Sequence, residues 1–360
     1  MTEDTVTAAA TASRSVFHRL VVVDVEALTD DSAAITFAVP GELAEAFAFA
    51  PGQSLTIRRG DERRSYSICS PAGTAPRIGV RAVAGGAVSG WLVRSVKPGD
   101  VIEAQAPSGT FTPDLSVAAD HVLIAAGSGI TPMMSIAASV LAAHPASTVT
   151  LLYGNRRSGT VMFADEVADL KDAYPARMRI VHVLSREPQE VELHSGRLDR
   201  DHLARLLPAT VSVPDVDHWW LCGPFGMVTD ALELLRSLGV PGSRLHRELF
   251  WVGDEPPAEA THAEAPVGPG AAVTVILDGR SSAFTLPPGT PVLDGAQQVR
   301  PDLPFACKGG VCGTCRARVV SGSAVMRRNY ALEDSEVSAG YVLTCQALPD
   351  SGEITVDYDA

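Results

Sequence analysis

Three cysteines lie close together near the C-terminus of this 360-residue chain, and a fourth follows further along. Cys307, Cys312 and Cys315 form the spacing C-x4-C-x2-C, and the distant residue is Cys345. Two bridged irons need four thiolates, and one loop can supply three of them only by wrapping closely around the inorganic core. The glycines between the cysteines allow turns that side chains forbid, and they bring backbone N–H groups towards the sulfurs. This spacing constrains the fold more than any other feature of the sequence.

The spacing predicts a plant-type [2Fe–2S] cluster held by these four cysteines. A structural zinc site also uses four thiolates, but its ligands usually come as two short clips, and here only Cys312 and Cys315 form one. A disulfide framework needs an oxidising compartment. The remaining cysteines, Cys69 and Cys222, stand alone, which fits a reducing cytoplasm better than a secreted scaffold.

Composition excludes several classes of protein. The chain is 46% hydrophobic and 20% charged, as globular proteins are, and its length suggests two or three domains. A net charge of −13 without a basic stripe argues against nucleic acid as a partner. The most apolar run, 122–143, is interrupted by glycines and a proline, so no membrane span is expected. The N-terminus lacks the features of a secretory signal, and we therefore expect a cytoplasmic protein.

Changes in composition and in the hydrophobic pattern along the chain predict five segments. Residues 1–15 are expected to be a disordered tail, and 16–113 contain short β-like runs between turn signals, which is typical of a small antiparallel barrel. Strands alternate with helices over 114–251, which predicts a doubly wound α/β domain. Residues 252–271 are rich in Pro, Ala and Glu and are interpreted as a linker, and 272–360 form a compact domain around the cysteines.

The barrel region contains the motif R-x-Y-S, from Arg64 to Ser67. Alternate side chains of a strand share a face, so Arg64 and Tyr66 would point the same way, one suited to a pyrophosphate and one to stacking on a flat ring. Further on, Gly86 and Ser89 could hold a second phosphate at the start of a helix. The alternative is a structural tyrosine beside a surface arginine.

Two more motifs follow predicted strands of the second domain. Gly127 to Pro132 reads G-S-G-I-T-P between a strand and a helix, where free N–H groups and the helix dipole favour an anion. It lacks the third glycine of the dinucleotide fingerprint, and a tight turn remains the alternative. Cys222, Gly223 and Pro224 end another strand, at the edge where open α/β sheets bind ligands. A lone cysteine in such a place is more often buried filler.

In this order, the motifs resemble the ferredoxin–NADP reductase superfamily with a fused plant-type ferredoxin, over nearly the whole chain from Phe17 onward. Segments 326–333 and 340–346 resemble more narrowly the reductase subunits of ring-1,2-phenylacetyl-CoA epoxidase, which couple NADPH oxidation to a di-iron oxygenase in phenylacetate catabolism. The resemblance implies a multidomain α/β and β fold with an antiparallel flavin-binding β-barrel, a doubly wound nucleotide-binding domain and a C-terminal β-grasp ferredoxin domain. It also implies an oxidoreductase that passes electrons from NADPH to FAD, to the [2Fe–2S] cluster and then to an oxygenase.

The resemblance further implies roles for the residues that match its motifs. Ser67, Cys222 and Glu248 would lie at the site of hydride transfer, with Tyr66 against the isoalloxazine ring. The residues expected at the flavin are Arg64, Ser65, Tyr66, Ser67, Val83, Gly86, Val88, Ser89 and Phe250. Those expected at the nicotinamide dinucleotide are Gly127, Gly129, Thr131, Pro132, Arg156, Ser185, Arg186, Cys222, Gly223 and Pro224.

The nucleotide is expected to be NADPH rather than NADH. Arg156 follows the second predicted strand of the nucleotide domain, and Ser185 and Arg186 follow the third, where this superfamily often places groups for a 2′-phosphate. No acidic residue obviously occupies the ribose-binding position that NAD enzymes use. The alternative for Arg186 is a solvated loop charge.

The expected partner is a di-iron oxygenase. After Arg328 the chain has no Lys or Arg and several acidic residues, which could steer docking to a basic partner or simply aid solubility. A flexible linker would let the cluster domain meet the flavin and the oxygenase in turn. Two alternatives remain open: the reductase component of another hydroxylase or ring-hydroxylating oxygenase, steroid or aromatic, and a zinc-stabilised binding protein without redox activity.

Overall fold

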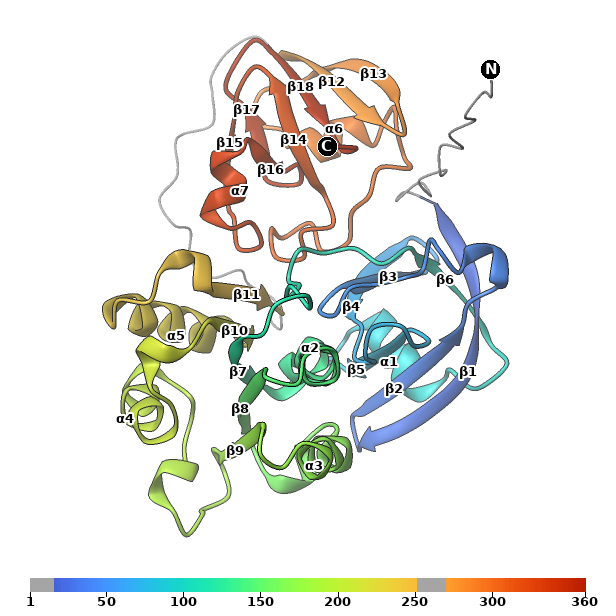
Figure 1. Cartoon of the computed structure of the whole chain (residues 1–360). Coiled ribbons are helices and arrows are strands. Elements are labelled where there is room, and N and C mark those ends of the chain that lie inside the picture. The colour runs from blue at the N-terminus through green and yellow to red at the C-terminus, as the bar shows by residue number, and fades with distance from the viewer. Residues whose placement is uncertain (1–15, 251–269) are drawn as a thin grey trace, which may run out of the picture.

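The computed structural model describes residues 16–250 and 270–360. The expected tail, 1–15, and nearly all of the expected linker, 252–271, lie outside the described residues. Figure 1 shows three lobes: an N-terminal lobe at the right, a central lobe at the lower left, and a C-terminal lobe above both. In the described ranges, no helix is long and apolar enough to cross a membrane.

The N-terminal lobe is an antiparallel sheet of six strands in the order β4-β3-β6-β1-β2-β5. A bridge between Ile68 and Ile78 brings the end of β4 to β5 and closes the sheet towards a barrel. Alternate residues such as Leu55 and Ile57 point into its core. The elements are β1 (Phe17–Thr29), β2 (Ser32–Ala38), η1 (Gly41–Leu43), β3 (Ser54–Arg59), β4 (Glu62–Ser67), β5 (Arg77–Arg81), α1 (Ala87–Arg94) and β6 (Val101–Gln105).

The central lobe is a parallel five-stranded sheet in the order β11-β10-β7-β8-β9, with helices on both faces, as a doubly wound fold requires. Its three central strands are mostly apolar because both faces are buried, whereas the two edge strands also carry His, Arg and Glu. The strands are β7 (Asp120–Ala126), β8 (Thr148–Asn155), β9 (Met178–Leu184), β10 (His218–Gly223) and β11 (Leu245–Leu249). The helices are η2 (Gly127–Gly129), α2 (Ile130–Ala143), η3 (Ser158–Thr160), α3 (Ala164–Ala173), η4 (Glu192–His194), α4 (Arg200–Thr210), η5 (Val213–Asp215), α5 (Phe225–Ser237) and η6 (Gly242–Arg244).

The C-terminal lobe has a mixed sheet in the order β13-β12-β18-β14-β16 and a two-stranded ribbon, β15-β17. Its central pair, β12 and β18, is parallel, and the other pairs are antiparallel. The elements are β12 (Ala271–Leu277), β13 (Arg280–Leu286), α6 (Val292–Ala296), β14 (Arg316–Ser321), β15 (Ala324–Met326), α7 (Asp334–Ser338), β16 (Tyr341–Leu343), β17 (Ala347–Pro349) and β18 (Glu353–Asp357). The predicted fold class of barrel, doubly wound sheet and terminal ferredoxin-like lobe is confirmed.

The N-terminal and central lobes share one apolar core and together form a body. Cys69 and Phe111 of the N-terminal lobe pack into the same buried cluster as Met133 and Ile136 of α2. The C-terminal lobe lies over the junction of the two and contacts both (Figure 1). Its cysteine loop therefore faces the place where the strand motifs of the body converge.

Candidate redox site

The fold brings the four cysteines of the C-terminal lobe together as two pairs. Cys307 lies beside Cys312, and Cys315 lies beside Cys345. Interaction with Cys312 lowers the pKa of Cys307, and interaction with Cys315 lowers the pKa of Cys345. Among the described residues, no group of three or more His, Cys, Asp or Glu is arranged around a single ion. Two thiol pairs side by side would suit a two-iron cluster better than one zinc ion, and these four sulfurs would hold it.

The loop that carries three of these thiols depends on glycine. Gly310 and Gly313 have φ angles of +81° and +66°, which side chains disfavour. A Cβ on Gly310 would lie 3.1 Å from Cγ of Gln346. The Gly309 N–H donates to the Cys307 sulfur over 3.3 Å, as expected of a loop that stabilises thiolates.

The R-x-Y-S motif lies on β4, at the edge of the N-terminal sheet. Arg64 is exposed and pairs with Glu62 at 3.2 Å. Tyr66 packs against the core of the N-terminal lobe, and burial raises its pKa. The hydroxyl of Ser65 does not join them, because it lies 3.1 Å from Oγ1 of Thr314 in the cysteine loop.

The G-x-x-S motif forms a tight turn at the start of α1. The Ser89 hydroxyl accepts a hydrogen bond from the Val83 N–H at 3.1 Å, and a Cβ on Gly86 would lie 2.6 Å from that hydroxyl. A side chain at position 86 would crowd this hydroxyl and the Val83 carbonyl, so glycine suits the turn at the start of α1, where free N–H groups could bind a phosphate. Val83 is exposed, whereas Val88 is buried in the core and faces away from the turn.

The three residues expected at the hydride-transfer site converge from three strands. The Ser67 hydroxyl on β4 donates to the Glu248 carboxylate on β11 at 2.9 Å. Glu248 is the register partner of Cys222 on β10, and Phe250 follows on the same side of the body, packed on the shared core. Burial raises the pKa of Glu248 to about 7, against the opposing effect of the Ser67 hydrogen bond. Burial and the nearby Glu248 raise the pKa of Cys222, which keeps it a neutral thiol.

Because the pKa of Glu248 is raised on folding, this carboxyl should make stability fall as pH rises. The unfolded chain releases the proton near pH 4.5 and the folded chain near 7, so the folded state binds more protons throughout that window. Relative to Glu248→Gln, the wild-type apoprotein should lose about 2 kcal/mol of unfolding free energy between pH 5 and 8, allowing for screening by solvent. Thermal melts across this pH range measure it. Parallel pH curves for the two proteins would contradict the assignment, and Glu42→Gln, at an exposed carboxyl on η1, is the control.

The glycine loop after β7 closes directly onto the end of β10. Gly127 has a φ of +55°, and its carbonyl accepts a hydrogen bond from the buried Tyr153 hydroxyl at 3.1 Å. A Cβ on Gly129 would lie 2.1 Å from the carbonyl oxygen of Cys222. Thr131 and Pro132 are buried in the first turn of α2, where proline costs no hydrogen bond. The backbone thus forms a narrow cradle suited to a pyrophosphate.

A second glycine, Gly223, sits beside this cradle with a φ of +157°, next to Pro224 at the start of α5. A Cβ there would lie 2.7 Å from Cε of Met227. The two glycines therefore let the ends of β7 and β10 approach each other closely. Tyr153, which fixes the first loop, has no sequence motif that singles it out.

Basic residues follow the next two strands. The Arg186 N–H donates to the Arg156 carbonyl at 2.8 Å, and the Ser185 N–H to the Asn155 carbonyl at 2.9 Å, so the ends of β8 and β9 are tied together. Arg156, Arg157 and Arg186 are exposed, and none of them forms an ion pair within the part of the chain that the structure describes. Unpaired guanidinium groups at a nucleotide-binding edge are suited to a phosphate.

Three family models match the chain in the order of the three lobes. They are the oxidoreductase FAD-binding domain over residues 19–112, the oxidoreductase NAD-binding domain over 123–233, and the 2Fe-2S iron-sulfur cluster binding domain over 275–350. The predicted FAD, pyridine nucleotide and [2Fe–2S] cofactors are confirmed at this level, and the choice between NADPH and NADH is not resolved.

Curated relatives match almost the whole chain. It is 41% identical to one of the subunits of 1,2-phenylacetyl-CoA epoxidase from Escherichia coli K12, over 96% of this chain and 98% of that protein. It is 33% identical to the ferredoxin reductase component of 3-ketosteroid-9-alpha-monooxygenase from Rhodococcus rhodochrous, over 94% and 97%. Among solved structures, phthalate dioxygenase reductase matches with a TM-score of 0.56 and 23% identity, over 95% of this chain and 98% of that one. This last similarity supports the fold.

Proposed function

This chain belongs to the family of oxygenase reductases that carry FAD-binding, NAD-binding and [2Fe–2S] domains in one polypeptide, and we propose that its partner is a di-iron oxygenase that acts on phenylacetyl-CoA. The similarity to the phenylacetyl-CoA epoxidase protein over nearly the full length of both chains supports this partner most strongly. The chain is an oxidoreductase, the reductase component of an oxygenase system. The organic substrate would bind the oxygenase and not this chain.

The chemistry requires a converter between electron pairs and single electrons. Nicotinamides deliver two electrons as hydride and an iron–sulfur cluster takes one at a time, and bound FAD supplies the chemistry that links them. In our proposal Tyr66 packs against the flavin ring, and Ser67 and Glu248 share a proton between Oγ and Oε2 at its edge. Cys222 and the loop at Gly129 hold the nicotinamide end, and burial excludes water from this thiol.

We further propose that residues 16–113, 114–251 and 272–360 are the three domains, joined by a linker at 252–271. β6 ends at Gln105 and β7 begins at Asp120, on either side of the first boundary. β12 begins at Ala271, where the proposed linker meets the last domain.

The partner is tested by reconstitution. The purified chain and NADPH should drive product formation by a phenylacetyl-CoA epoxidase oxygenase at least tenfold faster than by a 3-ketosteroid oxygenase assayed in the same way. Faster product formation by the 3-ketosteroid oxygenase would make that oxygenase the proposed partner instead. The steroid monooxygenase relatives, at 33% to 35% identity, favour this alternative.

The preference for NADPH depends on the exposed arginines after β8 and β9. Arg186→Ala should lower kcat/KM for NADPH about tenfold to a hundredfold, because a charge-assisted hydrogen bond to the 2′-phosphate is lost. For NADH, which lacks that phosphate, kcat/KM should stay within about twofold of the wild-type value. Arg197→Ala removes the same charge from a neighbouring exposed loop and serves as the control. Equal losses with both nucleotides, or a wild-type enzyme that prefers NADH, would overturn the assignment.

A further inference from the structure

β4 presents two sets of side chains to two different neighbours. Arg64 and Tyr66 belong to the proposed flavin site, whereas Arg63 and Ser65, which alternate with them, point to the other side of the strand. On that side the Ser65 hydroxyl lies 3.1 Å from Oγ1 of Thr314, and Arg63 donates to the carbonyl of Leu303 at 3.3 Å. Both partners belong to the C-terminal lobe, and the strand is thus shared between the flavin site and the cluster lobe.

Arg63 is held in an unusual environment for a charged side chain. Its guanidinium lies 5.1 Å from the ring centre of Phe17 in the N-terminal lobe and 4.3 Å from that of Phe305 in the C-terminal lobe. Burial lowers the pKa of Arg63, and the positive charge of Arg58 lowers it further. Its side chain donates hydrogen bonds to backbone carbonyls of the C-terminal lobe. These bonds and the two aromatic rings compensate for the cost of burying the charge.

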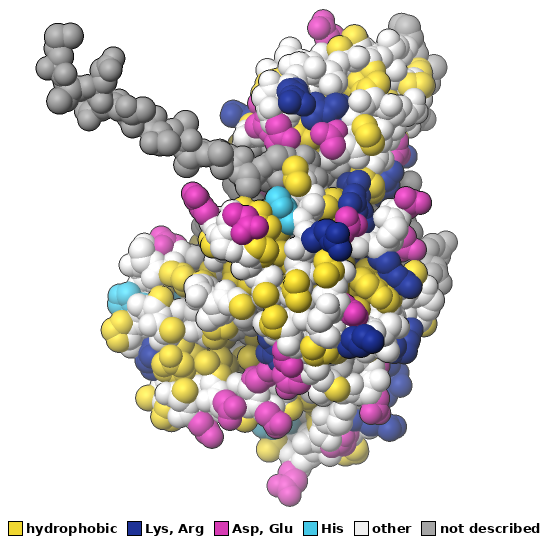
Figure 2. Space-filling view, turned by 90° about the vertical axis from the view of Figure 1, so that its right-hand side faces the viewer, with side chains coloured by type: hydrophobic (Ala, Val, Ile, Leu, Met, Phe, Trp, Pro, Cys, Tyr) yellow, Lys and Arg dark blue, Asp and Glu magenta, His cyan; other side chains and the backbone are white. Residues whose placement is uncertain are grey.

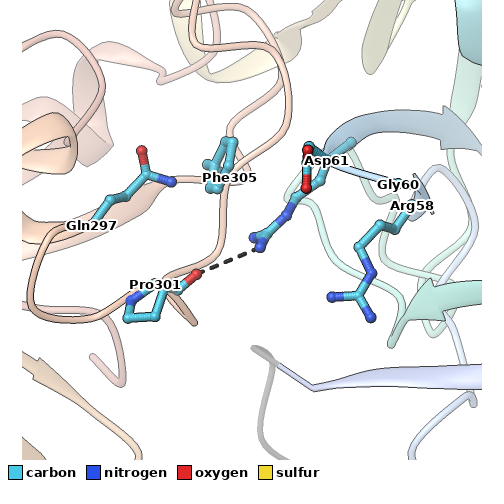
Figure 3. Close-up of a pocket in the computed structure, with 7 residues that line it drawn as sticks. Arg58, Gly60, Asp61, Gln297, Pro301 and Phe305 are labelled. Carbon is cyan, nitrogen blue, oxygen red and sulfur yellow. Dashed lines mark hydrogen bonds between the residues drawn. The ribbon is translucent and has the colours of Figure 1, made fainter.

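Figure 2 shows Lys and Arg side chains gathered where the C-terminal lobe meets the body. A cavity of about 300 Å³ lies at this junction. Figure 3 shows Arg58 on its body side and Phe305, Pro301 and Gln297 on its lobe side. The dashed line marks the hydrogen bond of 3.5 Å from Arg63 to the Pro301 carbonyl, which spans the junction. Because open space lies beside this hydrogen bond, Arg63 crosses the junction as a separate contact and is not part of a continuous apolar core.

Thr314 connects this bridge to the cluster. It stands between Cys312 and Cys315 in the cysteine loop, and its hydroxyl faces Ser65. The loop that carries these two cysteines is therefore linked by a hydroxyl pair to the residue that precedes Tyr66 on β4. At the far side of the lobe, Glu333 faces His246 of β11 at 3.3 Å and provides a second anchor on the central lobe.

We propose that Arg63 and Ser65 are positioning residues that hold the cysteine loop against β4 for the passage of electrons from flavin to cluster. The inference rests on the proposed function, since it assumes FAD at Tyr66 and a cluster at the four cysteines. With both cofactors bound, the redox chemistry would be theirs: the reduced flavin would give up one electron and one ferric ion of the cluster would accept it. Arg63 and Ser65 supply neither electrons nor protons and fix only the distance.

The test uses the full-length holoprotein with Arg63→Met or Thr314→Val. Each variant removes contacts across the junction while nearly conserving side-chain volume. NADPH-dependent ferricyanide reduction, which draws on the flavin, should stay within twofold of the wild-type rate. Cytochrome c reduction, which draws on the cluster, should fall about fivefold to tenfold. Backbone amide exchange over residues 301–314 should rise by a similar factor, because the lobe opens more often.

Arg58→Met is the matched control. It removes a guanidinium from the same face of the body, one that stacks on the same Phe17 ring but pairs with Glu103 and not with the C-terminal lobe. Cytochrome c reduction and amide exchange should then match the wild type. Unchanged values for both Arg63→Met and Thr314→Val would overturn the proposal. A wild-type protein without NADPH-dependent ferricyanide reduction would instead overturn the proposed function, while the exchange measurement would still test the docking contacts.

Discussion

Replacing Cys315 with serine is expected to abolish the cluster and to lower the rate of NADPH-dependent cytochrome c reduction by about a hundredfold or more. Loss of a residue that only supports a metal ligand lowers metal affinity or activity about tenfold to a hundredfold, so loss of a ligand itself should lower them by more. Cys315 is 3% exposed and pairs with Cys345, and serine offers a harder ligand that ionises far less readily than a thiol. Iron and sulfide content, together with the visible spectrum, measure cluster loss directly.

The same variant should keep its flavin and reduce ferricyanide at about the wild-type rate, because the flavin site lies on the body. Cys69→Ala is the control, since Cys69 is a buried thiol in the shared core of the body with no place in either site. It should retain the full iron content. If the Cys315→Ser protein stayed red-brown and kept its full iron content, Cys315 would not be a ligand of the cluster. A colourless wild type with bound zinc would end the redox interpretation altogether.

Sequence reasoning reaches the fold class and the cofactors because each depends on local pattern. The change from short strands with turns to alternating strands and helices distinguishes the barrel from the doubly wound sheet. The cysteine spacing alone identifies the four thiols that the fold brings together. The glycine at position 129 is recognisable from its place between a strand and a helix, although its contact with Cys222 is not.

Contacts between lobes are out of reach of such reasoning, because no local pattern encodes them. The R-x-Y-S motif predicts Ser65 at the flavin, yet its hydroxyl faces Thr314, which is 249 positions away in the chain. Tyr153 supports the glycine loop from inside a strand whose apolar pattern predicts only burial. In both cases the role follows from tertiary packing, which places a polar atom beside a distant backbone or hydroxyl.

The acidic C-terminal residues show the same limit. Their sequence pattern suggests a face for steering a basic partner, but several are used within the chain. Glu333 faces His246 of the central lobe, and Glu336 pairs with Arg316 at 2.9 Å. Asp359 accepts hydrogen bonds from the backbone of the turn between β12 and β13. Charge counts cannot distinguish a carboxylate that secures a lobe from one that meets a partner, and steering by this segment therefore has fewer free charges than the sequence suggests.

Gly129→Ala is expected to lower kcat/KM for NADPH about a hundredfold and to destabilise the central lobe by about 3 kcal/mol. The added Cβ would meet the Cys222 carbonyl oxygen at 2.1 Å and its carbon at 2.5 Å, and both are backbone atoms of a buried strand that cannot rotate away. The loop must shift, and a loop shift of about 1 Å costs about a hundredfold in a positioned reaction. Thermal melts and steady-state kinetics with both nucleotides measure the two effects.

The comparison that isolates this contact is Gly159→Ala, in the same lobe on η3, where a Cβ would meet nothing within 4 Å. That variant should be neutral or up to about 1 kcal/mol more stable, because alanine reduces the freedom of the unfolded chain. Flavin content should be unchanged in both, since Gly129 lies on the central lobe and the R-x-Y-S strand on the N-terminal lobe. If Gly129→Ala bound nucleotide normally, the loop would have to relax without moving the cradle, and the close approach of β7 and β10 would not define the nucleotide site.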